Sequence, residues 1–187
     1  MFSNKQREQI KETILKKSFE LFVRKGLEST SINDIAEYCN TYKAALYNYF
    51  GSKDGIVIEC SINYMNSLDE KLSRLANSSI STLRETLRGA FFLFSDEKIR
   101  MRFIYQVISS PNYGKESREK LSGIYKKYLD YSEVVAQKYN VPHESLRPYY
   151  LLLVATIHDF CLWENADFVI EKLNYILDRV QELEENK

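Results

Sequence analysis

The sequence predicts an all-α protein of about nine helices. Apolar side chains recur at intervals of three and four residues along most of the chain, whereas no stretch alternates with period two for long enough to indicate a strand. The 187 residues include only 6 Gly and 3 Pro, so few positions break a helix. A hydrophobic fraction of 44% with 28% charged residues is typical of a folded, soluble protein.

The first helix is expected over residues 5–25, and Gly26 is the C-terminal glycine that ends it. One face of this segment is apolar at helical spacing, through Leu15, Phe19, Phe22 and Val23. We interpret this helix as a core element that supports the segment after it.

Residues 30–53 are expected to form two short helices with a tight turn between them. Ser31, with Asp34 three residues on, predicts the N-terminal cap of the first helix, because a serine hydroxyl accepts from backbone N–H groups of the first turn and an acidic side chain suits the positive helix end. Asn40 lies where the chain must reverse, and Asn tolerates a positive φ.

The second short helix is expected from about Tyr42 to Tyr49, with Leu46 and Phe50 packing inward. Two helices of about two turns each bury too little apolar surface to be stable alone, so the longer helices on either side must support them. This arrangement is a helix-turn-helix, in which the second helix enters the DNA major groove and the first crosses the backbone.

Six further helices are expected beyond the motif, each from apolar positions at helical spacing. The first follows the candidate cap Ser52 and runs to about residue 75. The other five are expected over residues 83–94, about 97–110, 121–139, about 145–164 and about 168–183.

Two of these helices have expected caps. Ser79 or Ser81 is the candidate cap of the helix over residues 83–94. Ser145 is the candidate cap of the helix that begins there, which would place Pro148 in the first turn, where the missing N–H costs nothing.

Several short segments in and around the motif carry one pattern: Gly26-Leu27, Thr30-Ser31-Ile32, Asp34-Ile35-Ala36, Lys43, Leu46-Tyr47, Tyr49-Phe50 and Ser52-Lys53. Together they resemble the N-terminal signature of the TetR family of bacterial transcriptional regulators, over about the first third of the chain. Beyond it only the helical character agrees. The resemblance implies a helix-turn-helix DNA-binding domain over residues 1–52 and a helical ligand-binding and dimerisation domain over residues 53–187.

The resemblance also implies which residues touch DNA. Lys43, Ala44 and Ala45 are expected to face the bases. The residues expected to contact phosphates are Thr30, Ser31, Tyr42, Tyr47, Tyr49 and Lys53.

The sequence at the turn and at the start of the second short helix, the recognition helix, departs from the common family pattern. The chain has Cys39-Asn40-Thr41-Tyr42-Lys43-Ala44-Ala45 where the common pattern is Ala-Gly-Val-Ser-Lys-Gly-Thr. Two alanines offer only apolar contact, for instance with a thymine methyl group, so hydrogen-bonded readout must come from Lys43, Tyr42 or Asn48. We therefore predict a thymine-containing operator that is read partly by shape.

A homodimer is expected, because one short recognition helix covers few base pairs and such motifs gain affinity as two-fold dimers on palindromic sites. The family suggests the last two helices as the dimer surface. The first of them is apolar nearly all round from Tyr149 to Trp163, and the second carries a stripe that needs a partner surface. The alternative is that this stripe packs only within its own chain. Its members are Leu173, Ile176, Leu177, Val180 and Leu183.

A pocket for a small effector between the middle helices is implied by the family, and a packed core is the alternative for each residue. With few charges among these positions, we expect a largely apolar or aromatic ligand, for which His158 is a candidate polar handle or an ordinary core histidine. The candidate lining residues are Tyr64, Phe91, Phe94, Phe103, Tyr125, Tyr128, His158, Phe160 and Trp163.

The charge distribution is compatible with a DNA-binding N-terminal end. The net charge of the chain is zero, but residues 1–53 carry nine Lys and Arg against six Asp and Glu, a difference of plus three. Three glutamates near the C-terminus have the opposite sign: Glu182, Glu184 and Glu185.

The expected compartment is the cytoplasm. Cys39, Cys60 and Cys161 are odd in number and widely spaced, which disfavours a disulfide framework and a CxxC metal site. The first residues are polar and lack the apolar core of a signal peptide. The longest apolar run, Tyr149–Ile157, is far shorter than the ~20 residues that span a bilayer.

Catalysis is not expected. The chain has only two histidines, His143 and His158, and no nucleophile motif, glycine-rich phosphate loop or HExxH pattern, so we expect neither a cofactor nor a metal. Three alternatives stay open beside the repressor: a helical small-molecule-binding protein that has lost specific DNA recognition, a helical enzyme with its site among the aromatic residues, and a thiol sensor through Cys39 or Cys161.

Overall fold

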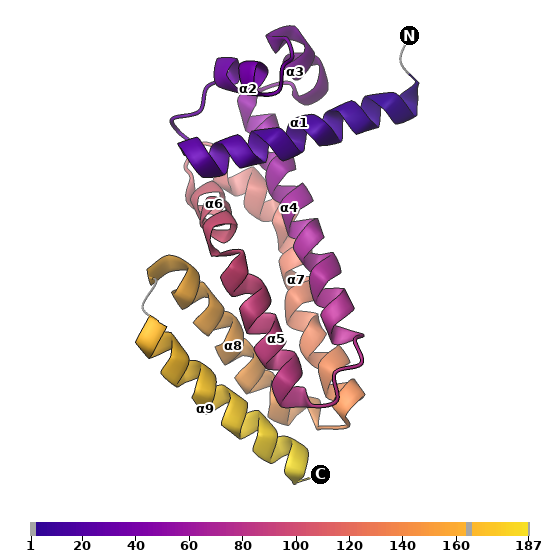
Figure 1. Ribbon diagram of the computed structural model, residues 1–187, viewed down its shortest axis with the longest axis vertical. Coiled ribbons are helices and arrows are strands. Elements are labelled where there is room, and N and C mark those ends of the chain that lie inside the picture. Colours follow the sequence, from indigo (N-terminus) through magenta and orange to yellow (C-terminus); the bar gives the residue numbers. More distant parts are fainter. Residues whose placement is uncertain (1–2, 164–165, 187) are drawn as a thin grey trace. The chain divides into compact units, whose positions relative to one another are not determined.

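The computed structural model describes residues 3–163 and 166–186, and within them every regular element is an α-helix (Figure 1). The predicted all-α fold of about nine helices is thereby confirmed for this part of the chain. The helices are α1 (Asn4–Lys25), α2 (Ile32–Tyr38), α3 (Lys43–Phe50), α4 (Lys53–Ala76), α5 (Leu83–Asp96), α6 (Lys98–Ser109), α7 (Gly114–Tyr139), α8 (His143–Trp163) and α9 (Ala166–Glu185). The expected helix end at residue 164 lies outside the described residues.

The local signals around the motif are confirmed. Ser31 caps α2 by accepting from the backbone N–H of Asp34 at 3.2 Å, and the Asp34 carboxylate accepts in return from the backbone N–H of Ser31 at 2.7 Å. Gly26 follows α1 with a φ of 92°, and Asn40 reverses the chain with a φ of 53°. Ser52 caps α4, since its hydroxyl accepts from the backbone N–H of Gly55 at 3.0 Å.

Two expected caps are wrong. The hydroxyl that accepts from the first turn of α5 belongs to Thr82, the residue next to the helix, and neither Ser79 nor Ser81 does so. α8 begins at His143, two residues before Ser145, and the carbonyl of Pro142 accepts from the backbone N–H groups of Ser145 and Leu146. Pro148 therefore lies inside the helix, beyond its first turn.

α7 begins seven residues earlier than the apolar pattern indicates. The buried positions of its first turns are Gly114 and Ser117, which precede Leu121 at helical spacing. Because glycine and serine are not apolar markers, this part of the helix gives no hydrophobic periodicity.

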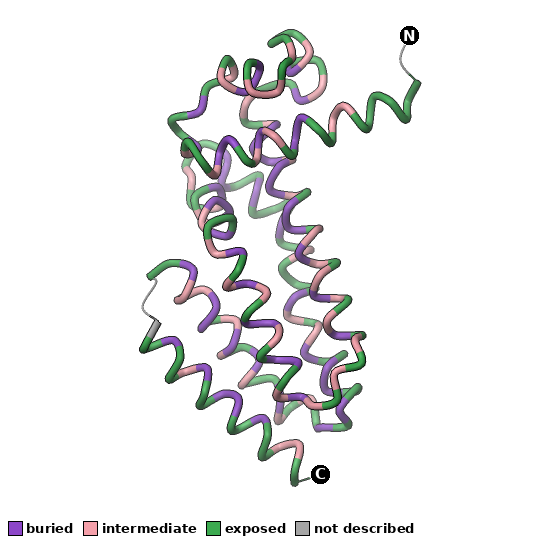
Figure 2. The backbone as a smooth tube through the Cα atoms, in the orientation of Figure 1, coloured by how far each residue is buried: buried purple, intermediate pink, exposed green. Residues whose placement is uncertain are grey.

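The chain divides into two compact units. The first holds α1, α2, α3 and the part of α4 up to Asn66, together with Phe103–Leu121. In its core Phe19 stacks on Tyr64 with ring centroids 4.9 Å apart and meets Phe103 edge-on at 5.1 Å. Figure 2 shows buried positions along the later turns of α1, whereas residues 3–9 are all exposed.

The second unit holds Ser67–Arg102 and the chain from Ser122 onward, in which α5, α8 and α9 pack against one another. Four members of the α9 stripe predicted to need a partner surface are buried within their own chain, namely Leu173, Ile176, Leu177 and Val180, and the fifth, Leu183, is half-buried. Glu97, at the end of α5, is bound by Lys71 at 2.5 Å and by Arg100 at 2.9 Å. Among the described helices none has the length and apolar character needed to cross a membrane.

Candidate nucleic-acid interface

α2 and α3 are held by a small apolar core that leaves one side of α3 open. Ile35 of α2 and Leu46 of α3 are almost fully buried, and Phe50 is buried at the end of α3. α2 packs against α1 and against α3. The two short helices thus depend on the longer α1 for their position, as helices of two turns require.

The open side of α3 carries most of the residues expected to touch DNA. Tyr42, which precedes the helix, is 84% exposed, and Tyr47 is 48% exposed. Lys43, Ala44 and Asn48 are exposed as well. Ala45 and Tyr49 are half-buried at the edge of this face. The three aromatic residues Tyr47, Tyr49 and Phe50 therefore do not all face inward.

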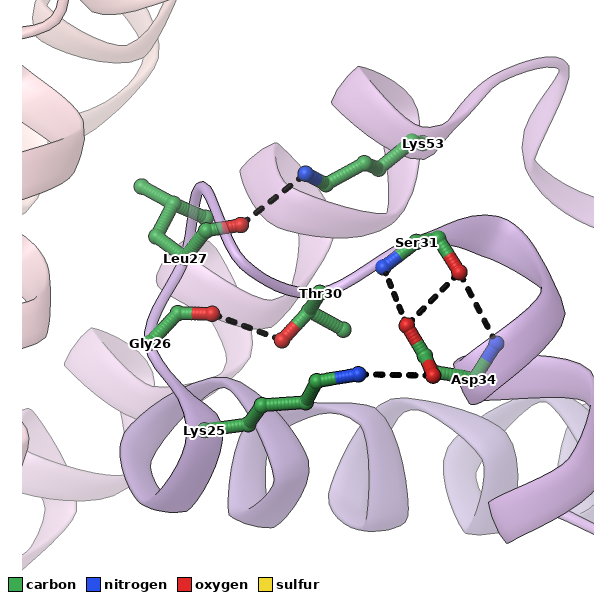
Figure 3. A network of polar contacts seen from close by, with 7 residues as sticks. All are labelled: Lys25, Gly26, Leu27, Thr30, Ser31, Asp34 and Lys53. Carbon is green, nitrogen blue, oxygen red and sulfur yellow. Dashed lines mark hydrogen bonds and ion pairs between the residues drawn. The ribbon is translucent and has the colours of Figure 1, made fainter.

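At the junction between α1 and α2, two side chains donate hydrogen bonds to the backbone carbonyls of Gly26 and Leu27 (Figure 3). The hydroxyl of Thr30 donates to the carbonyl of Gly26 at 2.6 Å, and the ammonium of Lys53 donates to the carbonyl of Leu27 at 2.9 Å. Thr30 is 1% exposed and Lys53 is half-buried. Two of the residues expected at phosphates thus have partners inside the chain, and the side chain of Thr30 is not part of the surface.

Ser31 and Asp34 form the second half of this network. The Ser31 hydroxyl donates to Asp34 Oδ2 at 2.6 Å, and Lys25 Nζ lies 2.7 Å from Asp34 Oδ1 (Figure 3). The hydrogen bonds from Lys25 and then from Ser31 hold the pKa of the Asp34 carboxyl well below its usual range. The carboxylate is therefore charged at neutral pH, with a cation beside it.

We expect Lys53→Met to lower the free energy of unfolding by about 1 to 2 kcal/mol, because the Leu27 carbonyl loses a charged donor. Lys43→Met is the matched control, since Lys43 is exposed and its loss should leave stability unchanged. Urea denaturation of the two variants checks this. Unchanged stability of Lys53→Met together with weaker DNA binding would assign Lys53 to a phosphate and not to the junction.

The residues expected to line an effector pocket divide between the two units. Tyr64 and Phe103 belong to the first unit, in the aromatic core around Phe19. Trp163 ends α8 and is 75% exposed. The other six lie in the second unit as three ring pairs with centroids 5.6–6.3 Å apart: Phe91 with Phe160, Phe94 with Tyr128, and Tyr125 with His158.

His158, on α8, is half-buried, and this burial lowers the pKa of its imidazole below its ordinary value. The ring is accordingly neutral at pH 7 and suits an uncharged hydrogen-bonding role. This is compatible with a polar handle in an apolar site.

The cysteines lie in surroundings that disfavour thiolate chemistry. Cys60 is fully buried against the carbonyl of Leu15, and burial raises the pKa of its thiol well above the usual value. Burial also raises the pKa of Cys39, whose sulfur lies 3.8 Å from the carbonyl of Ile14. Cys161 is buried in α8. Reactive thiols have lowered pKa values and exposed sulfur atoms.

Two contacts of the first unit were not foreseen from the sequence. The hydroxyl of Tyr113 donates to Glu28 at 3.1 Å, which ties the turn before α7 to the loop after α1. Burial, with the Glu28 contact second, raises the pKa of Tyr113 to about 12. The ion pair of Lys25 with Asp34 is the other. Neither pairing is marked by a local pattern, because each joins separate elements.

A family model described as bacterial regulatory proteins, tetR family, matches residues 14–60, the segment that contains this motif. The chain is similar to the biofilm operon icaADBC HTH-type negative transcriptional regulator IcaR of Staphylococcus aureus. The two are 29% identical over 140 residues, which cover 69% of this chain and 74% of IcaR.

Solved structures share the fold. The regulator FadR of Bacillus subtilis, in complex with stearoyl-CoA, superposes with a TM-score of 0.65 at 17% identity, over 90% of this chain and 97% of FadR. The TetR family transcriptional regulator PfmR of Thermus thermophilus gives a TM-score of 0.64 at 21% identity, over 95% of this chain and 97% of PfmR. At these identities the likeness concerns the fold.

Proposed function

This chain belongs to the TetR family of bacterial regulatory proteins, and we propose that it is a repressor that binds a palindromic operator as a dimer and is released by a small, largely apolar or aromatic ligand. The observation that carries the proposal is the exposed face of α3, which lies in the segment matched by the family model and is held by buried Ile35 and Leu46. Its relative IcaR is a negative regulator by name.

In this proposal α3 enters the major groove. Lys43, Tyr42 and Asn48 supply the hydrogen-bonding groups, and Ala44 and Ala45 meet thymine methyl groups. Ser31, Tyr47 and Tyr49 lie nearest to phosphates, and Lys53 keeps two further N–H donors beside its bond to Leu27. Residues 1–52 then form the DNA-binding domain and residues 53–187 the ligand-binding and dimerisation domain.

The dimer is proposed to form through the outer sides of α8 and α9. The inner stripe of α9 is already covered by its own chain, so the contact falls to apolar side chains that stay exposed. Leu151, Leu162 and Ile170 are 41%, 50% and 51% exposed. α8 and α9 pack against each other, and exposed apolar side chains on neighbouring helices are suited to a protein interface.

The effector is proposed to bind near the ring pairs of the second unit, around Tyr125, Tyr128 and His158. A protein of the same fold, FadR of Bacillus subtilis, has been solved with stearoyl-CoA, a ligand with a long apolar chain. An effector acts only through different affinities for the DNA-competent and DNA-incompetent states, so effector and operator must weaken each other by the same factor.

Selection of random duplex DNA on the purified protein tests the repressor proposal. We expect a palindrome whose half-sites lie about one DNA turn or more apart, with thymine preferred at one or more positions of each half-site. Enrichment of half-sites without any thymine preference would contradict the role of the paired alanines. If no sequence is enriched, the repressor proposal fails and the alternative without specific DNA recognition stands.

A thermal-stability screen of metabolites tests the effector proposal. We expect apolar or aromatic compounds to raise the melting temperature, because a ligand that binds only the folded state stabilises it. The same compounds should weaken binding to the selected duplex. Binding only by highly charged metabolites that carry no apolar chain or aromatic ring would contradict the proposed ligand class.

A further inference from the structure

We infer that Lys25 is a positioning residue for DNA binding. Its ammonium neutralises the carboxylate of Asp34 and so allows α2 to approach the phosphate backbone. The inference rests on the proposed function, since it concerns the helix that crosses the backbone in a helix-turn-helix. Lys25 is the last residue of α1, and nothing in the family signature assigns it a role.

Asp34 has a structural task that places a negative charge at the start of α2. Its Oδ2 accepts from both the backbone N–H and the hydroxyl of Ser31, at 2.7 and 2.6 Å. The hydroxyl in turn accepts from the Asp34 backbone N–H. This capping box fixes the first turn of α2, and an acidic residue suits that end of a helix.

The same carboxylate is unfavourable beside DNA. Ser31 and Asn33 around it are exposed, and the Asp34 side chain keeps 31% of its accessible surface. A phosphate that contacts this end of α2 would lie within about one Debye length of the carboxylate, which is ~10 Å at 0.1 M salt. Salt would therefore screen the repulsion between the two charges only in part. The cap therefore carries a repulsive charge on the side that meets the polyanion.

Lys25 removes that charge without disturbing the cap. Its ammonium binds Oδ1, the oxygen that Ser31 does not use, at 2.7 Å (Figure 3). The Lys25 side chain is 41% exposed, and exposed ion pairs contribute little to folding stability. The effect of the pair is accordingly expected in DNA binding more than in the folding of the chain.

Four proteins separate this role from the other possibilities: the wild type, Lys25→Met, Asp34→Asn and the double variant. An asparagine at position 34 keeps an oxygen that can accept from Ser31. The affinity of each protein for the duplex selected by the wild type is measured over a range of salt concentrations, and urea denaturation reports folding.

We expect Lys25→Met to bind roughly fivefold more weakly per half-site at low salt, because the Asp34 charge is uncovered. Asp34→Asn should bind more tightly, since the Lys25 ammonium becomes available. The slope of log affinity against log salt should become shallower by about one per half-site in the first variant and steeper by about one in the second. The double variant should return to the wild-type affinity and slope.

Other outcomes overturn the inference. If the double variant stays as weak as Lys25→Met, Lys25 contacts phosphate independently of Asp34. If all three variants weaken binding with an unchanged slope, the pair is only structural. Failure of the wild type to select any duplex is a failure of the proposed function, and it is distinct from unchanged binding by Lys25→Met, which refutes this inference alone.

The matched control is Lys172→Met. Lys172 forms an ion pair with Asp159 at the same 2.7 Å, with similar exposure of 30% and 34% for the two side chains, but within the second unit. The Lys172→Met variant should leave the slope of log affinity against log salt unchanged.

Discussion

Ala44→Glu is expected to abolish specific DNA binding while the protein stays folded. Ala44 is exposed on the open side of α3, so a longer side chain displaces nothing in the core. In a groove lined by phosphates a carboxylate is repelled, and like charges brought together at an interface cost several kcal/mol, or about a hundredfold or more in affinity. Fluorescence anisotropy with the selected duplex measures the loss, and circular dichroism measures the fold.

Gln137→Glu is the control for Ala44→Glu. It adds the same charge at an exposed helical position, on α7, which the proposal keeps away from DNA. This variant should bind like the wild type. An Ala44→Glu protein that binds within a few-fold of the wild type would show that α3 does not enter the groove.

Leu151→Arg is expected to give a monomer with strongly reduced operator affinity. Leu151 lies on α8 and is 41% exposed in the single chain, so the arginine is tolerated by the fold but would be buried in the proposed dimer. Burial of an unpaired charge at an interface is costly. Losing the link between two half-site contacts removes about 10² to 10⁴ in affinity. Sedimentation velocity and anisotropy measure the two effects.

Val134→Arg is the control for Leu151→Arg, because Val134 is an apolar residue of almost equal exposure, 40%, on α7. It should remain a dimer. A Leu151→Arg protein that sediments as a dimer would move the interface away from this side of α8.

The helix-turn-helix could be predicted because its determinants are local. Ser31 and Asp34 are three residues apart, Asn40 marks the reversal, and Leu46 and Phe50 are spaced by one helical turn. Each of these signals acts over a few residues and needs no knowledge of the rest of the fold.

The partners of Thr30 and Lys53 could not be predicted in the same way. α1 ends at Lys25, so the carbonyls of Gly26 and Leu27 that follow it are not used by a helix. In the proposed complex these carbonyls compete with phosphates for the same donors. The sequence shows that a side chain can donate, but not which acceptor the fold brings to it.

The aromatic residues illustrate a second limit. Tyr64 lies on α4, a helix whose first part belongs to one unit and whose later part belongs to the other. Helical periodicity shows that Tyr64 faces a core, but it does not show which one. In the structure its ring stacks on Phe19 in the first unit, whereas Tyr128 and its ring partner Phe94 belong to the second unit.

The dependence of operator affinity on salt tests whether this chain is a dimeric DNA-binding repressor. For the wild-type protein and its selected duplex, we predict a linear fall of log affinity with log salt, by a factor of about 10³ or more between about 50 mM and about 200 mM, with two chains bound per duplex. An affinity that does not change with salt, or no selectable duplex at all, would show that the chain is not a dimeric DNA-binding repressor.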